Sequence, residues 1–175
     1  MRINKKKFIY LISPNKIRES FYHDLIEILK LKKVSFFQLR LKNTTFKKKL
    51  IIGKKIKDIC KKYQTKFLIN DDVLLAQKLD ADGCHLGQKD INIFRARKLI
   101  PHKIIGITCH NSKKLANSAI SNKAYYLAFG AFNKSTTQKT KFKTISNILK
   151  DIKNIKKTPL ISICGLNHII TKKLP

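Results

Sequence analysis

The chain has 175 residues, and its 43% hydrophobic content predicts one globular domain over residues 1–175 and argues against a disordered chain. Its 39 basic residues outnumber its 10 acidic residues, which gives a formal net charge of +29. The lysines are spread along the whole chain, and no RNA-binding motif of interleaved basic and aromatic residues is visible. We therefore expect codon bias and phosphorylated ligands, and not nucleic-acid binding, to account for the charge.

No apolar run is long enough for a membrane span, and residues 8–13 are too short a run for a signal peptide. The cysteines are Cys60, Cys84, Cys109 and Cys164, and none of them belongs to a CxxC pair. This spacing argues against a zinc ribbon or a redox dithiol, and it favours free buried thiols in a reducing cytoplasm.

Short apolar runs alternate with helical patterns along the chain. We expect strands at 8–13, 34–40, 67–70, 83–86, 103–108, 125–129 and 160–163. We expect helices after Asn15 as an N-cap, at 48–61, from Asp72, at 91–99, from Ser112 and at 142–155. Ile28 and Ile51 are predicted to lie on the apolar faces of the first two helices.

This alternation predicts an α/β fold with a parallel sheet, either doubly wound or closed as a TIM (β/α)8-type barrel. No glycine-rich dinucleotide fingerprint follows any strand, and polar residues gather at the carboxyl ends of the strands. A barrel explains that distribution better, because all of its strand ends meet at one mouth. The chain stops after the seventh strand, so we expect a barrel that lacks its eighth βα unit.

The end of the second strand carries Gln38, Arg40 and Lys42 at alternate positions. On an extended strand these side chains point to the same side and would present an amide and two cations together. Such a group suits a multiply charged phosphate, although a solvated edge in a lysine-rich chain is the simpler explanation. A charge inside a barrel strand is costly without a ligand, which favours a binding site.

Acidic and amide side chains follow the third and fourth strands: Asn70 and Asp71 after one, and Asp90 after the other. Carboxylates at neighbouring strand ends can share Mg²⁺, which takes one or two carboxylates together with substrate phosphate. Helix capping is the alternative role for Asp71 and Asp72, and Asp72 fits that role well.

Hydroxyl groups follow the fifth and sixth strands. Thr108 ends the fifth strand, and the loop after the sixth strand contains Ser135, Thr136, Thr137 and Lys139. Hydroxyls, backbone amides and a lysine in one loop can bind an anion, or they can form an ordinary polar loop. Gly165 follows the seventh strand, where a residue without a side chain lets a ligand approach closely or simply forms a turn.

Several blocks of the sequence resemble the thiamine-phosphate synthase family, in the same order and at matching spacing. They are Tyr10-Leu11-Ile12-Ser13, Gln38-Leu39-Arg40-Leu41-Lys42, Phe67-Leu68-Ile69-Asn70-Asp71-Asp72, Ala81-Asp82-Gly83-Cys84-His85-Leu86-Gly87-Gln88-Lys89-Asp90, Ala96-Arg97, Gly106-Ile107-Thr108 and Gly130-Ala131-Phe132. The blocks that contain Asn70-Asp71 and His85 to Asp90 are the specific ones.

The resemblance implies a Mg²⁺-dependent transferase that joins 4-amino-2-methyl-5-hydroxymethylpyrimidine diphosphate to 4-methyl-5-(2-phosphoethyl)thiazole. Pyrophosphate leaves first, a pyrimidine carbocation forms, and the thiazole nitrogen attacks it to give thiamine phosphate. The partners are then two small phosphorylated substrates, with no nucleic acid and no membrane, and a homo-oligomer stays open.

The resemblance also implies a role for each matching residue. Gln38, Arg40, Lys42 and Asn70 would hold the pyrimidine diphosphate, Asp71 and Asp90 would bind Mg²⁺, Thr108 would contact the pyrimidine, and Ser135, Thr136, Thr137 and Gly165 would bind the thiazole phosphate. His85 and Gln138 are also expected among the substrate-binding residues, although a lone histidine at a strand end is more often a satisfied polar residue than a catalytic one. Arg40, Lys42, Thr108 and Lys139 are the expected catalytic residues.

The chain departs from the family pattern at Gln138, where the family has a lysine that Lys139 offers one place later. It also has Cys164 in place of the first residue of a glycine pair. Three alternatives therefore stay open: a related thiazole tautomerase, a barrel that has lost its catalysis, and a basic nucleic-acid binder. The acidic residues Asp71 and Asp90 argue against the tautomerase, which needs no diphosphate-bound metal.

Overall fold

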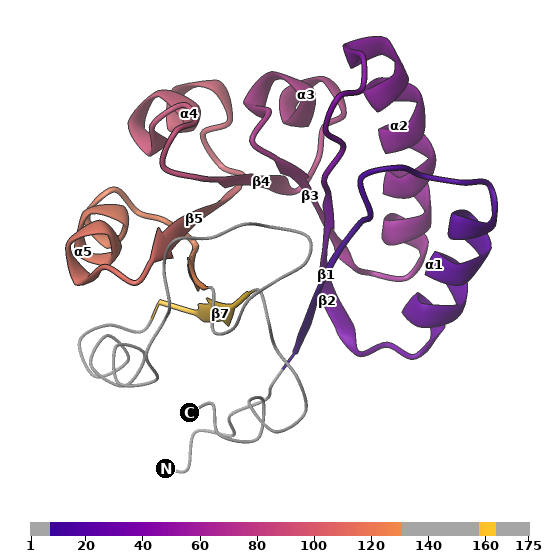
Figure 1. The fold of residues 1–175 in the computed structure, drawn as a ribbon, viewed down its shortest axis with the longest axis horizontal. Helices are drawn as coiled ribbons and strands as arrows, with labels where there is room; N and C mark the ends of the chain where they lie inside the picture. Colours follow the sequence, from indigo (N-terminus) through magenta and orange to yellow (C-terminus); the bar gives the residue numbers. More distant parts are fainter. Residues whose placement is uncertain (1–7, 131–157, 164–175) are drawn as a thin grey trace. The chain divides into compact units, whose positions relative to one another are not determined.

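A computed structural model of the chain describes residues 8–130 and 158–163 (Figure 1). The chain forms two compact units that divide between Cys84 and His85. Within the described residues, parallel strands alternate with helices in both units, which is the arrangement predicted for an α/β fold. The predicted helix at 142–155 lies outside the described residues.

The first unit contains three parallel strands and three helices. The strands are β1 (Ile9–Ile12), β2 (Val34–Leu39) and β3 (Lys66–Asn70), and the helices are α1 (Ser20–Lys30), α2 (Phe46–Lys62) and α3 (Val73–Lys78). β2 pairs with β1 on one side and with β3 on the other. The predicted strands are confirmed, with boundaries that differ by one or two residues at most.

The core of the first unit forms where α1 and α2, which lie side by side, pack on the strands (Figure 1). Phe37 of β2 stacks on Phe67 of β3 with ring centroids 6.5 Å apart, and both side chains are fully buried. Leu29 of α1 and Ile56 of α2 are also fully buried. These apolar contacts hold the carboxyl ends of β2 and β3 at a fixed separation.

The apolar faces of the first two helices differ from the prediction by one residue. Ile28 and Ile51 are 40% and 57% exposed, whereas their neighbours Leu29 and Ile52 are buried. Each helix carries a run of consecutive apolar residues, so the sequence pattern allows two neighbouring stripes. The packing against the strands selects between them.

Side-chain caps begin most of the described helices. The predicted cap Asp72 accepts a hydrogen bond from the backbone N–H of Leu75 at 3.0 Å. Ser112, where a helix was expected to start, caps α5 by accepting one from Leu115 at 3.3 Å. The prediction that Asn15 caps the first helix is wrong, because α1 begins at Ser20. The Asn15 side chain instead accepts a hydrogen bond from Arg40.

The second unit begins within β4 (Gly83–Leu86) and continues through four further elements and a last strand. These are α4 (Ile93–Leu99), β5 (Ile104–His110), α5 (Lys113–Ser121), β6 (Tyr126–Phe129) and β7 (Leu160–Ser162). β6 pairs in parallel with β5 and with β7. A bulge interrupts the β5–β6 register between Thr108 and His110, so Cys109 is the extra residue at the carboxyl end of β5.

We expect Ile56→Ala to lower the free energy of unfolding by about 2–5 kcal/mol, because it leaves a cavity beneath α2 where the native side chain is 0% exposed. Ile51→Ala on the same helix is the control, and it should change stability by less than about 0.5 kcal/mol. Urea unfolding followed by circular dichroism measures both variants. Equal losses in the two variants would contradict the assignment of the buried face.

Candidate active site

In the first unit, three side chains from adjacent strands form a hydrogen-bonded row. Gln38 of β2 is 3% exposed and lies between Tyr10 of β1 and Asn70 of β3. The Tyr10 hydroxyl donates to Gln38 Oε1 at 2.6 Å, and Gln38 Nε2 donates to Asn70 Oδ1. The row therefore fixes the orientation of both amides, and it brings together two residues that the sequence predicted to bind substrate.

Arg40 follows β2 and is 9% exposed. Its backbone N–H donates to Ser13 Oγ at 2.9 Å, and its guanidinium Nη1 donates to Asn15 Oδ1 at 2.8 Å. Both partners are neutral side chains in the segment that follows β1. A guanidinium whose hydrogen-bond partner is a neutral amide can still pair its charge with a phosphate.

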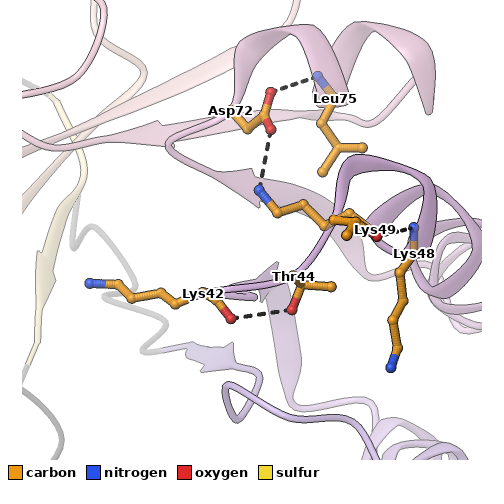
Figure 2. Close-up of polar contacts among 7 residues, drawn as sticks. Lys42, Thr44, Lys48, Lys49, Asp72 and Leu75 are labelled. Atoms are coloured by element: carbon orange, nitrogen blue, oxygen red, sulfur yellow. Dashed lines mark hydrogen bonds and ion pairs between the residues drawn. The ribbon is translucent and has the colours of Figure 1, made fainter.

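Lys42 does not lie on the strand face that the alternating pattern predicted, because β2 ends at Leu39. Its exposed side chain extends away from Lys48 and Lys49, while its carbonyl oxygen accepts from the Thr44 hydroxyl at 3.2 Å (Figure 2). The chain leaves the strand after Leu39 and turns toward the start of α2.

Asp72 holds the turn that follows β3. One carboxylate oxygen caps α3, and the other lies 3.5 Å from Lys49 Nζ on α2 (Figure 2). The Asp72 N–H donates to the carbonyl oxygen of Asn70 at 2.8 Å, which closes a three-residue turn around Asp71. The capping role expected for Asp72 is thus confirmed.

Asp71 occupies the centre of this turn with a φ of 64°, in the left-handed region. Its side chain is exposed. A non-glycine residue in such a turn costs on the order of 1–3 kcal/mol, and conformations of this kind concentrate at functional sites. The strained backbone presents the Asp71 carboxylate at the end of β3.

In the second unit, His85 of β4 lies between Thr108 of β5 and Tyr126 of β6. Its Nδ1 is 2.9 Å from the Tyr126 hydroxyl, and its Nε2 is 2.8 Å from Thr108 Oγ1. The imidazole is 7% exposed and stacks on the Tyr126 ring. Burial lowers the pKa of His85 to about 4, although the charge of Asp90 opposes this effect, so the imidazole is neutral at neutral pH.

Asp90 closes the loop that follows β4. Its Oδ2 accepts from the backbone N–H of Gly87 at 2.6 Å, so one oxygen of the carboxylate is held in place. A Cβ atom at Gly87 would lie 3.1 Å from that oxygen, which explains the value of a glycine there. Gln88 extends from the same loop, and its Nε2 donates to the Thr108 carbonyl oxygen at 2.5 Å.

Asp71 and Asp90 lie in different units. Within residues 8–130 and 158–163, no group of three or more histidine, cysteine or acidic side chains is gathered as a metal cluster. In the same part of the chain, no helix is long and apolar enough to cross a membrane. The predicted site residues Ser135, Thr136, Thr137, Gln138, Lys139 and Gly165 lie outside the described residues.

Four polar partners of the predicted site were not expected from the sequence: Tyr10, Ser13, Asn15 and Tyr126. Both tyrosines lie within apolar strand runs, where they are indistinguishable from core aromatic residues. Ser13 and Asn15 flank Pro14, and this local context predicted only the end of the first strand and a helix cap.

A family model described as thiamine monophosphate synthase matches residues 9–174. A thiamine-phosphate synthase of Pelagibacter ubique is 57% identical over 99% of this chain and 86% of its own length. One of Saccharophagus degradans is 37% identical over 76% of this chain and 62% of its own length. The solved thiamine phosphate pyrophosphorylase of Pyrococcus furiosus superposes with a TM-score of 0.79 at 28% identity, over 93% of this chain and 77% of that one. These similarities confirm the predicted family and the barrel class.

The buried His85 should make stability depend on pH. Its folded pKa of about 4 lies below the ordinary value of 6.5, so the unfolded chain takes up the proton first. The stabilisation is fully present above pH 6.5 and is lost as the pH falls toward 4, by at most about 1.4 kcal/mol per pH unit. Urea unfolding across this range measures the slope.

His85→Gln should flatten that slope, whereas His23→Gln, at an exposed histidine of α1, should leave it unchanged. An unchanged slope in His85→Gln would contradict the assignment of a buried neutral imidazole.

Proposed function

This chain belongs to the thiamine monophosphate synthase family, and we propose that it joins the pyrimidine diphosphate to the thiazole phosphate to form thiamine phosphate and pyrophosphate. The observation that carries the proposal is the 57% identity to a thiamine-phosphate synthase over nearly the whole chain. Thiamine-phosphate synthases are transferases. The buried row of polar residues at the ends of β2 and β3 supports the same chemistry.

Charge development on the leaving pyrophosphate is the main demand of this reaction. Arg40 is suited to meet it, because its guanidinium is buried and held by the neutral side chain of Asn15. Gln38 donates to Asn70 Oδ1, so the Asn70 amide nitrogen is left to donate to a substrate oxygen. Donors fixed before the reaction stabilise the developing charge without reorganising.

We further propose that Asp71 and Asp90 provide carboxylate oxygens for Mg²⁺. Carboxylates are the ligands that this ion prefers, and each of these two is presented by its own backbone feature: the strained turn at Asp71 and the Gly87 N–H at Asp90. Asp72 caps α3 and lies close to Lys49, which argues against Asp72 itself as a ligand. When bound, the ion would neutralise charge on the departing pyrophosphate.

The remaining roles rest on the family resemblance. We propose that Thr108 contacts the pyrimidine, that Lys42 contacts its diphosphate, and that Ser135 to Thr137 and Gly165 bind the thiazole phosphate. His85 and Gln138 are proposed as further substrate-binding residues. Lys139 is proposed to supply the charge that the family places one position earlier. A homo-oligomer remains compatible with these roles.

We propose that the protein works in the cytoplasm. Cys60, Cys84 and Cys109 are all buried and free, which suits a reducing compartment.

Purified chain with both phosphorylated substrates should form thiamine phosphate in the presence of Mg²⁺ and should form none with EDTA. Asp71→Ala and Asp90→Ala should each lower turnover by at least about a hundredfold, because each removes a proposed ligand of the charge-neutralising ion. Chromatographic detection of the product measures all reactions.

Asp58→Ala is the matched control, since Asp58 is an exposed aspartate of α2. It should retain full turnover. Turnover that survives in both ligand variants would contradict the metal assignment, and a folded wild-type chain without product would favour the non-catalytic barrel.

A further inference from the structure

A hydrogen-bonded chain of three polar side chains connects β6, β4 and β5 in the second unit. It runs from the Tyr126 hydroxyl through the two ring nitrogens of His85 to the Thr108 hydroxyl, over distances of 2.9 and 2.8 Å. A neutral imidazole has one donor and one acceptor nitrogen. The hydrogen bonds from Tyr126 through His85 to Thr108 can therefore run in only one of two directions. The direction decides whether the Thr108 hydroxyl donates its proton to His85 or to another acceptor.

The chemistry of the two end groups selects the direction. A phenol has a pKa of about 10 and is a strong hydrogen-bond donor, while an imidazole nitrogen is a better acceptor than a phenol oxygen. The favoured arrangement has the Tyr126 O–H donating to Nδ1 of His85. Nε2 then carries the proton and donates to Thr108 Oγ1, so the Thr108 O–H points to another acceptor.

The position of the Tyr126 ring is fixed on two sides. The ring stacks on His85 with centroids 5.7 Å apart and an interplanar angle of 13°, and it is 1% exposed. Gly106 lies opposite Tyr126 in the parallel register of β5 and β6, and a Cβ atom at Gly106 would overlap the ring. The ring therefore packs directly on the β5 backbone, which places its hydroxyl beside Nδ1 of His85.

Thr108 is fixed through its own backbone as well. Gln88 donates to its carbonyl oxygen, and the bulge at Cys109 follows it directly. Bulges next to active sites commonly set the direction of a side chain. Thr108 is half-buried, whereas His85 and Tyr126 are buried, so Thr108 is the member of the chain that can reach a ligand.

We propose that Tyr126 is a positioning residue, which fixes His85 as the Nε2–H tautomer and thereby makes the Thr108 hydroxyl a hydrogen-bond donor to an acceptor atom of the pyrimidine substrate. The identity of that ligand rests on the proposed function. The tautomer itself does not, because it is a property of the free protein.

Long-range ¹H–¹⁵N correlation spectra of histidine-labelled protein test the tautomer directly. In the wild type, the His85 spectrum should show a protonated Nε2 and an unprotonated Nδ1. Tyr126→Phe keeps the ring and removes only the hydroxyl, and it should shift the population toward the Nδ1–H tautomer. A wild-type His85 with its proton on Nδ1 would overturn the proposal, whatever the variant does.

Kinetics test the consequence for the substrate. Tyr126→Phe should lower kcat/KM for the pyrimidine diphosphate by about five- to tenfold, the factor expected for one directed hydrogen bond. Tyr125→Phe, at the neighbouring tyrosine that is 51% exposed, should leave kcat/KM unchanged. In a Thr108→Val background, Tyr126→Phe should cause no further loss, because the hydroxyl that it directs is already gone.

The outcomes separate this proposal from the proposed function. An equal loss from Tyr126→Phe in both backgrounds would overturn the role of Thr108, even in an active synthase with the expected tautomer. A wild type that makes no thiamine phosphate would overturn the proposed function and the substrate contact with it, while the spectra would still decide the tautomer.

Discussion

A polar side chain can be buried only if another group satisfies its hydrogen bonds, and this constraint governs the strand ends of both units. Gln38, Arg40 and His85 are each less than 10% exposed, and every buried side-chain nitrogen and oxygen in the described residues has a partner. The partners of all three lie on, or directly after, other strands. The strand register that builds the fold therefore also sets the distances within the candidate site, so a slip of one residue would disrupt both.

Local chemistry explains which features could be predicted from the sequence. The strands follow from continuous apolar runs, and the caps Asp72 and Ser112 act on residues three positions away. The features that were missed depend on distant partners. Asn15 was expected to cap a helix, but it bonds Arg40, 25 residues along the chain, and nothing nearby in the sequence signals this contact. The bulge after Thr108 likewise depends on pairing with β6.

Two tyrosines perform the same task in separate units. The Tyr10 hydroxyl orients Gln38, and the Tyr126 hydroxyl bonds His85. Tyrosine suits this task because its ring packs in an apolar layer while its hydroxyl reaches a polar neighbour. A buried strand position therefore hides its second role in the sequence, where tyrosine and phenylalanine satisfy the same hydrophobic pattern. The pattern of polar residues at strand ends and the family resemblance both identified the predicted ligand-binding residues, but the residues that orient them act through contacts between strands that the sequence does not reveal.

The buried cysteines give each unit a built-in reporter of its own motions. Cys60 in α2 and Cys109 in β5 are fully buried, and burial raises the pKa of each thiol to about 12. Alkylating reagents attack the thiolate, and a thiol with such a raised pKa forms almost no thiolate at neutral pH. Each cysteine therefore reacts only when its surroundings open. The rate of alkylation at Cys60 therefore reports how often the first unit opens, and the rate at Cys109 reports the same for the second.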